Sequence, residues 1–328
     1  MQRRGALAAI LIALTAMIGG PLTVAGLVGV PQPHVGLVPE EPALGYPVIR
    51  QTPLMSATAR RQVKASDQVG RFIVAGGDFL EVETTNGGTM IPHQYFAAWN
   101  IDTKQLACPG QFSFNAEVLA IEPGLTPTSV YVGGRFSKVA GADGIELNRN
   151  KVVLLDLATC SVDTRFQIQG INSKVNNLEL VGGRLYVGGD FSKVAGLDIE
   201  TVAQLDAVTG AVNPAFSFVT EGEMGNRVLG MRASPDGSRL IIGGRWGTMA
   251  GTGGTVPMPT AVVDISSPDA PRLTGHRSTG YVRLDDLQDV SVSPDATKMG
   301  LVFGTATTSD YVYLTATTES PVTYTWRK

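Results

Sequence analysis

The chain has 328 residues, of which 39 are glycine, 19 are proline and only 17% are charged, and its formal net charge is −3. Hydrophobic residues make up 43%, enough for a sizeable core, which excludes a disordered chain; the glycines have no three-residue period, which excludes a collagen. No basic stripe of the kind that nucleic-acid binding leaves is present. A glycine-rich, charge-poor globular chain predicts many turns between many short strands.

The N-terminal segment has the pattern of an export signal. Arg3 and Arg4 precede a charge-free run of 27 residues, from Gly5 to Pro31. A basic start followed by an apolar run is typical of a secretory signal, and about 20 apolar residues suffice to span a bilayer. Residues 1–31 are therefore predicted to form a hydrophobic helix that is a signal peptide or an uncleaved membrane anchor. A buried core helix is the alternative.

Residues 32–58 are predicted to be a proline-rich linker. Pro33, Pro39, Pro42, Pro47 and Pro53 remove backbone donors and stiffen this stretch. The linker would hold residues 59–328 away from a membrane or cell wall. We expect a protein that is secreted, or anchored and facing outside, and that touches the membrane only through its N-terminal segment.

A repeat of about 55 residues fills the remainder of the chain. Its four clearest copies are IVAGGDF (73–79), VYVGGRF (130–136), LYVGGDF (185–191) and LIIGGRW (240–246). The glycine pairs are Gly76-Gly77, Gly133-Gly134, Gly188-Gly189 and Gly243-Gly244, at steps of 57, 55 and 55 residues (133 − 76, 188 − 133, 243 − 188). A fifth, weaker copy contains MGLVFGT (299–305), YVYLTATT (311–318) and VTYTWRK (322–328).

Other elements keep the same register. An aspartate before a turn is followed ten residues later by phenylalanine in Asp102/Phe112, Asp156/Phe166 and Asp206/Phe216, and the fourth copy keeps only Asp264. Each unit thus contains four short strands rich in β-branched and aromatic residues. The predicted fold class is all-β, a β-propeller of five four-stranded blades. The units lie near 59–115, 116–170, 171–220, 221–280 and 281–328; a parallel β-solenoid, whose coils are shorter, is the alternative.

The segments LYVGGDFSKVAG (185–196) and VAQLDAVTGAVNPAF (202–216) resemble bacterial secreted propeller repeats of the delta-sixty type, a β-propeller family of unknown function. The resemblance covers about residues 60–310 and is weakest in the fifth unit. It implies the propeller fold and an extracellular or envelope location, and it carries no assigned chemistry. The phenylalanine-ending strand is not recognisable in the last two units.

The recurring glycine pairs are interpreted as structural, because glycine inside a strand usually marks a bulge or a close backbone approach. Contact with a ligand through the bare backbone is the alternative. GGDF also resembles part of a cyclic-dinucleotide synthase signature, but two of the four copies carry Arg in place of Asp.

The residue after each glycine pair alternates in charge: Asp78, Arg135, Asp190, Arg245. We expect Asp–Arg ion pairs between neighbouring blades, since guanidinium can donate two parallel hydrogen bonds to a carboxylate. A charged ligand site around the channel is the alternative. The aromatic residues that follow, Phe79, Phe136, Phe191 and Trp246, should face the opposite side and pack between blades.

Two turn features complete the repeat. The aspartates at 102, 156, 206 and 264 should cap turns by accepting bonds from their own backbone. Cys108 and Cys160 lie on the same hairpin of adjacent units, so a disulfide between them is expected in an oxidising compartment, with two free buried thiols as the alternative.

The loops after the glycine pairs are the candidate interaction surface, because loops on a rigid scaffold carry function. The first three are acidic through Glu81, Glu83, Asp143, Glu146, Asp198 and Glu200; simple solvation is the alternative. No catalytic, cofactor-binding or metal-ligating residue is predicted. We expect a non-enzymatic binding or scaffolding module whose partner is a protein or glycan at the cell surface. The alternative is a glycosidase-like propeller, which needs two carboxylates facing each other across a sugar.

Overall fold

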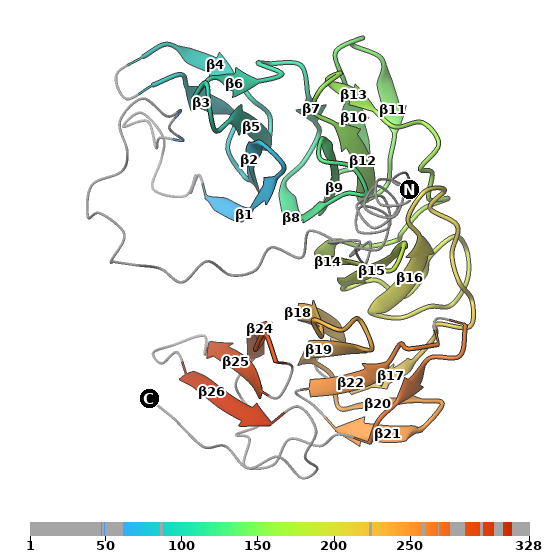
Figure 1. Cartoon of the computed structure of the whole chain (residues 1–328). Helices are drawn as coiled ribbons and strands as arrows, with labels where there is room; N and C mark the ends of the chain where they lie inside the picture. The colour runs from blue at the N-terminus through green and yellow to red at the C-terminus, as the bar shows by residue number, and fades with distance from the viewer. Residues whose placement is uncertain are drawn as a thin grey trace, which may run out of the picture. The chain divides into compact units, whose positions relative to one another are not determined.

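The computed structural model describes residues 47, 49, 62–85, 88–222, 225–257, 260–267, 269–275, 286–295, 298–304 and 311–316. Within these ranges the chain is all-β, with many small antiparallel sheets (Figure 1). No helix that could cross a membrane occurs in them. The predicted N-terminal helix at 1–31, most of the linker at 32–58 and the strand predicted at 322–328 lie outside the described residues.

Five antiparallel sheets follow one another along the chain, each formed by one of the sequence repeats; we number them repeat sheets 1 to 5. Sheet 1 consists of β1 (Val63–Val69), β2 (Phe72–Gly77), β5 (Phe96–Asn100) and β6 (Leu106–Ala107). Sheet 2 consists of β8 (Val118–Pro123), β9 (Ser129–Gly134), β12 (Val152–Asp156) and β13 (Ser161–Val162). Sheet 3 consists of β14 (Val175–Val181), β15 (Arg184–Gly189) and β16 (Val202–Asp206). Sheet 4 consists of β18 (Arg227–Ala233), β19 (Arg239–Arg245), β22 (Thr260–Asp264) and β23 (Arg272–Leu273). Sheet 5 consists of β24 (Asp286–Val292), β25 (Lys298–Gly304) and β26 (Tyr311–Ala316).

The segments expected to be loops after the glycine pairs are β-hairpins in three of the four copies. They are β3 (Glu81–Glu83) with β4 (Met90–Pro92), β10 (Lys138–Ala140) with β11 (Glu146–Asn148), and β20 (Thr248–Gly251) with β21 (Gly254–Pro257). The last two gain a third strand from β7 (Ser113–Phe114) and β17 (Val219–Glu221), which come from the preceding repeat. The two small sheets that contain β10 and β20 therefore join one repeat to the next.

A β-bulge recurs at one place in every repeat sheet. The register between the first two strands shifts between Val63 and Ala65, Val118 and Ala120, Val175 and Asn177, Val228 and Gly230, and Leu287 and Asp289. In sheets 1 to 4 the residues opposite the shift are the two glycines of the pair. The Gly-Gly signature therefore marks a bulge, as the structural interpretation expected.

The two glycines of a pair are needed for different reasons, as Gly133 and Gly134 show. A Cβ on Gly133 would lie 2.8 Å from Cγ1 of Val175, the residue that begins sheet 3. A Cβ on Gly134 would strike the carbonyl oxygen of Glu117, which accepts a hydrogen bond from Arg135 N at 3.0 Å within sheet 2. The first glycine thus allows neighbouring sheets to approach, and the second allows the bulged hairpin to close.

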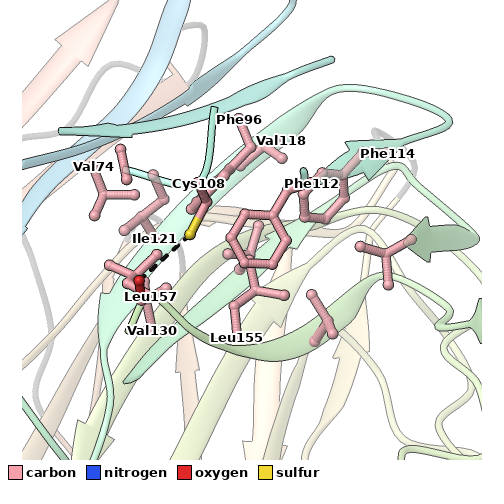
Figure 2. Close-up of a cluster of buried hydrophobic side chains, with 14 of the residues drawn as sticks. Val74, Phe96, Cys108, Phe112, Phe114, Val118, Ile121, Val130, Leu155 and Leu157 are labelled. Atoms are coloured by element: carbon pink, nitrogen blue, oxygen red, sulfur yellow. Dashed lines mark hydrogen bonds between the residues drawn. The ribbon is translucent and has the colours of Figure 1, made fainter. Parts of the chain in front are cut away.

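Hydrophobic clusters fill the spaces between successive repeat sheets rather than forming one central core. The cluster between sheets 1 and 2 contains Phe96, Phe112 and Phe114, with ring centroids 5.6 Å and 5.8 Å from Phe96, packed against Val118 and Leu155 (Figure 2). In the cluster between sheets 2 and 3, Tyr131 packs against Phe166, and in the cluster between sheets 3 and 4, Tyr186 packs against Phe216. The residues after the charged position, Phe79, Phe136, Phe191 and Trp246, are at most 2% exposed, so their predicted burial is confirmed.

The aspartate caps are confirmed for three repeats and wrong for the first. Asp156 and Asp206 each accept hydrogen bonds from the backbone two and three residues ahead, and Asp264 from Ser266. In sheet 1 the capping side chain is Asn100, whose Oδ1 accepts from the backbone of Asp102 and Thr103. Asp102 forms an ion pair with Arg71 instead. The first repeat is two residues longer between cap and phenylalanine, which misled the alignment.

Candidate functional site

The first strands of the repeat sheets surround the candidate functional site. β1, β8, β14, β18 and β24 are each the edge strand of their sheet, and each contacts the next in chain order. Because one side of an edge strand keeps unpaired backbone groups, this region is intrinsically polar. All five strands line one cavity of about 380 Å³.

The cavity wall combines apolar surface with hydrogen-bonding groups of both kinds. Leu119, Ile121, Leu229 and Met231 supply apolar surface, while Ser66, Asn176 and Asn177 supply hydroxyl and amide groups; the charged members are Lys64, Asp67, Arg232 and Asp289. Lys64, Leu119, Asn176 and Leu229 are the bulged residues of their strands. The bulge therefore recurs where the chain meets the cavity, as bulges at functional rims do.

A row of charged residues at one position of the repeat crosses the first strands beside the cavity. Four residues after the valine that precedes the bulged residue of each strand lie Asp67, Glu122, Glu179 and Arg232. Glu122 Oε1 accepts a hydrogen bond from Leu180 N at 3.1 Å, and Glu179 Oε1 accepts one from Ala233 N at 2.9 Å. Both carboxylates thus bind the first strand of the next sheet.

At the two ends of this row, Asp67 and Arg232 do not bind the backbone of the next sheet as Glu122 and Glu179 do. The backbone position that Asp67 would bind is Pro123, which has no N–H to donate, and Asp67 accepts a bond from its neighbour Gln68 N at 2.7 Å. Arg232 has no acceptor to offer sheet 5, and its Nη1 lies 3.3 Å from Glu179 Oε2. Glu179 is 14% exposed and Arg232 half exposed.

The carboxylates of this row hold protons more tightly than usual. Burial, reinforced by the nearby Glu179 charge, raises the pKa of Glu122 to about 8. Burial also raises the pKa of Glu179 and of Asp67 above their ordinary values. Carboxyl groups with perturbed pKa beside a cavity are typical of functional sites, although structural networks show the same behaviour.

Sequence reasoning missed this row because its distance from the glycine pair varies. The turn between the first two strands has two residues in sheets 1 and 3 but five in sheets 2 and 4. The offset to the glycine pair therefore alternates between 9 and 11 residues (76 − 67, 133 − 122, 188 − 179, 243 − 232). The distance from the valine that precedes the bulged residue is constant at four residues, so that valine would have aligned the four charged positions.

Three of the four alternating charges after the glycine pairs, Asp78, Arg135 and Asp190, form local contacts instead of the expected chain between sheets. Arg135 Nε lies 2.6 Å from Glu117 Oε1, and Lys174 Nζ lies 3.3 Å from Asp190 Oδ2, each pair within one repeat. Asp78 accepts a hydrogen bond from Gln62 N. Within the described residues, neither Asp78 nor Asp190 is an ion-pair partner of Arg135. The fourth charged residue, Arg245, is the last residue of β19.

The six acidic residues of the predicted rim have unequal surroundings. Glu146 lies 2.5 Å from Lys138, and Asp198 pairs with Lys193, so two charges are offset locally. Asp143 caps Ile145 N at 3.0 Å, and Glu200 accepts from the amide and hydroxyl of Thr220. Glu81 and Glu83 lie in β3, where Glu83 is buried. The structure thus assigns local structural contacts to Asp143, Glu146, Asp198 and Glu200.

A disulfide joins Cys108 and Cys160, with Cα atoms 5.5 Å apart, as expected from the sequence. It connects the segment after β6 in sheet 1 with the turn before β13 in sheet 2. Cys108 is 5% exposed, and its sulfur lies 3.4 Å from the carbonyl oxygen of Leu157 within the hydrophobic cluster (Figure 2).

Nothing in the described ranges assembles three His, Cys, Asp or Glu side chains into a metal site. His93 is buried, with Nδ1 at 3.2 Å from the Phe96 carbonyl oxygen and Nε2 accepting from Gly110 N. Burial lowers the pKa of His93, so the neutral form is favoured. His34 and His276 lie outside the described residues.

Comparison with known proteins gives no relative from which a function can be transferred. No protein-family model matches the sequence, and no curated protein matches it.

Proposed function

We propose that this protein is an exported, non-enzymatic binding or scaffolding module of the β-propeller type, acting at the cell envelope or outside the cell. The observation that carries the proposal is a polar cavity lined by the first strands of all five repeat sheets. Strands from sheets 1 and 5 share that cavity, which supports a five-bladed ring of the delta-sixty type. The disulfide and the basic, apolar N-terminus support export.

The cavity chemistry favours a small polar ligand group, such as a sugar unit of a surface glycan. Its volume of about 380 Å³ falls within the range of small-molecule sites, roughly 300–1,000 Å³. Asn176, Asn177 and Ser66 can exchange hydrogen bonds with hydroxyl groups, and Leu119 and Leu229 can cover the apolar face of a ring. A protein partner would place a polar side chain in the same cavity.

The binding proposal is tested with the exported chain on a glycan array and in pull-downs from envelope fractions. We expect captured ligands to be lost in Arg232→Gln, which changes a cavity residue, and retained in Arg165→Gln. Arg165 is the matched control, because it also pairs with an acid, Asp163 at 2.6 Å, but lies outside this cavity. Equal binding by both variants would place the ligand elsewhere.

Export is tested separately by fusing residues 1–58 to alkaline phosphatase, which is active only outside the cytoplasm. Activity in intact cells is expected, and deletion of residues 5–31 should abolish it. Fractionation of the fusion then separates a cleaved signal from a retained anchor.

A glycosidase is the second candidate, favoured by one observation. Glu122, with a pKa of about 8, would be protonated at neutral pH as a general acid must be, and further carboxylates, Glu179 and Asp67, lie near it. Against this, Glu122 and Glu179 already bind backbone N–H groups of the next sheet. Hydrolysis of chromogenic glycosides that disappears in both Glu122→Gln and Glu179→Gln, with glycan binding retained, would favour the enzyme.

A further inference from the structure

A second cavity, of about 460 Å³, lies between repeat sheets 2 and 3. It is lined by Arg135, Lys151, Asn172, Ser173, Lys174 and Asp190. Arg135 directly follows β9 and Lys151 directly precedes β12 in sheet 2, and the other residues flank β14 and β15 in sheet 3. None of these six residues lines the cavity formed by the first strands, so this is a separate place on the molecule.

The charges of this second cavity are unbalanced. Its wall contains three cations and one carboxylate, Asp190, which lies 3.3 Å from Lys174. Arg135 pairs with Glu117 at 2.6 Å, yet its side chain stays about half exposed. Within the described residues, Lys151 has no carboxylate at ion-pair distance, and its Nζ donates a hydrogen bond to the carbonyl oxygen of Arg135 at 2.7 Å. Of the three cations, Lys151 is therefore the one that has no acidic partner within the described residues.

The repeat itself does not require these cations. The position of Lys151 is Tyr95 in sheet 1 and Thr201 in sheet 3, and all three residues have positive φ (75°, 69° and 60°). Their backbone contacts are also the same, because each carbonyl accepts from the second glycine of its pair. Lys174 likewise replaces Gln62 and Glu117, whose carbonyl oxygens make the same bulge contact. The backbone therefore explains the conformation of these positions but not their charge.

We propose that the cavity of Arg135, Lys151, Ser173 and Lys174 is a binding site for an oxyanion, the carboxylate, sulfate or phosphate group of an extracellular ligand. Three cations and a hydroxyl line this open cavity, and Lys151, which has no acidic partner, supplies a charge-assisted donor to such a group. Binding would relieve the repulsion between Arg135 and Lys151. Burial and the Arg135 charge both lower the pKa of Lys151, which is consistent with a lysine that has no acidic partner.

The test is calorimetric titration of the exported chain with sodium sulfate, sodium phosphate and sodium glucuronate, with chloride added to keep ionic strength constant. We expect saturable binding of at least one of the three, and the preferred anion distinguishes a sulfate, phosphate or carboxylate source. Lys151→Asn, which tolerates a positive φ, should weaken that binding about tenfold or more, whereas Lys151→Arg should retain it. Lys193→Gln, an exposed lysine already paired with Asp198, is the matched control and should bind as the wild type does.

Several outcomes would overturn the proposal. They are the absence of saturable binding by all three anions, an equal loss in Lys193→Gln, or unchanged binding in Lys151→Asn. If Lys151→Asn fails to fold, Arg135→Gln decides in its place, with thermal unfolding without anion as the check on folding. Arg232→Gln should leave anion binding unchanged, so this site and the proposed glycan-binding function succeed or fail independently.

Discussion

At the scale of single residues, the same chemical group serves different purposes according to what faces it. Glu122 and Glu179 reach backbone donors on the next sheet, whereas Asp67 faces a proline and binds its own neighbour. The carboxylates therefore satisfy edge-strand N–H groups that have no strand partner, a need that the hydrogen-bonding capacity of the backbone imposes.

The first prediction concerns the protonation of Glu122. Its pKa of about 8 in the folded protein exceeds the ordinary value of 4.5, so the native state binds more protons than the unfolded state between these values. Stability from this group is present below about pH 4.5 and is lost as pH rises through 8. Glu122→Gln keeps an acceptor for Leu180 N and lacks the titration. The variant should therefore gain stability relative to the wild type from pH 4 to pH 8, on the order of 2–4 kcal/mol.

Urea unfolding of both proteins at pH 4, 6 and 8 measures this difference. Glu146→Gln is the control, because Glu146 is an exposed carboxylate paired with Lys138. The difference in stability between this variant and the wild type should be small at all three pH values. A difference that stays flat or decreases with pH would contradict the raised pKa.

At the scale of elements, the unit of construction is a bulged hairpin whose glycine pair contacts the next sheet. In repeat sheets 1 to 4 the bulge lies opposite the glycine pair, which explains why the glycines are the strongest sequence signal. The turns between the first two strands, by contrast, vary in length from sheet to sheet. That variation hid the charged row, and the longer stretch before Phe112 led to the prediction of Asp102 as the cap of sheet 1, where the structure has Asn100.

The second prediction tests the approach of neighbouring sheets. Gly133→Ala should destabilise the protein by about 1–3 kcal/mol, because its Cβ would lie 2.8 Å from Val175 Cγ1. Val175→Ala removes that methyl group, so the double variant should be less destabilised than the sum of the single variants by about 1 kcal/mol or more.

Denaturant unfolding of the four proteins gives this coupling energy. Val263→Ala, an equally buried valine in sheet 4, is the control partner for Gly133→Ala and should show additive effects. Additivity with Val175 as well would mean that the two sheets do not meet at this glycine.

At the scale of the whole molecule, stability depends on the joints between sheets. Four of the hydrophobic clusters are each shared by neighbouring repeats, so a sheet on its own would leave one face uncovered. The first two sheets have a covalent joint as well, the disulfide between Cys108 and Cys160.

The third prediction concerns this covalent joint. A bond across a sequence separation of 52 residues should contribute about 4 kcal/mol by restricting the unfolded chain. Reduction with dithiothreitol, or the double variant Cys108→Ala/Cys160→Ala, should therefore lower the unfolding midpoint, and the two treatments should agree. Wild type and double variant are compared by thermal unfolding with and without reductant. A reduced wild type as stable as the oxidised protein would show that the joint is held by the cluster alone.

The sequence by itself determined what local backbone geometry imposes at a fixed period. The glycine pairs, the buried aromatic residues after them, the three aspartate caps and the cysteine pairing follow from rules that operate within one repeat or between adjacent ones. The tertiary structure decided which charges meet. Arg135 binds Glu117 rather than an aspartate of the next sheet, and Glu122 reaches Leu180, because these partners depend on turn lengths and on how five edge strands converge. Side-chain partners are set by distances in space, and a repeat period fixes only positions along the chain.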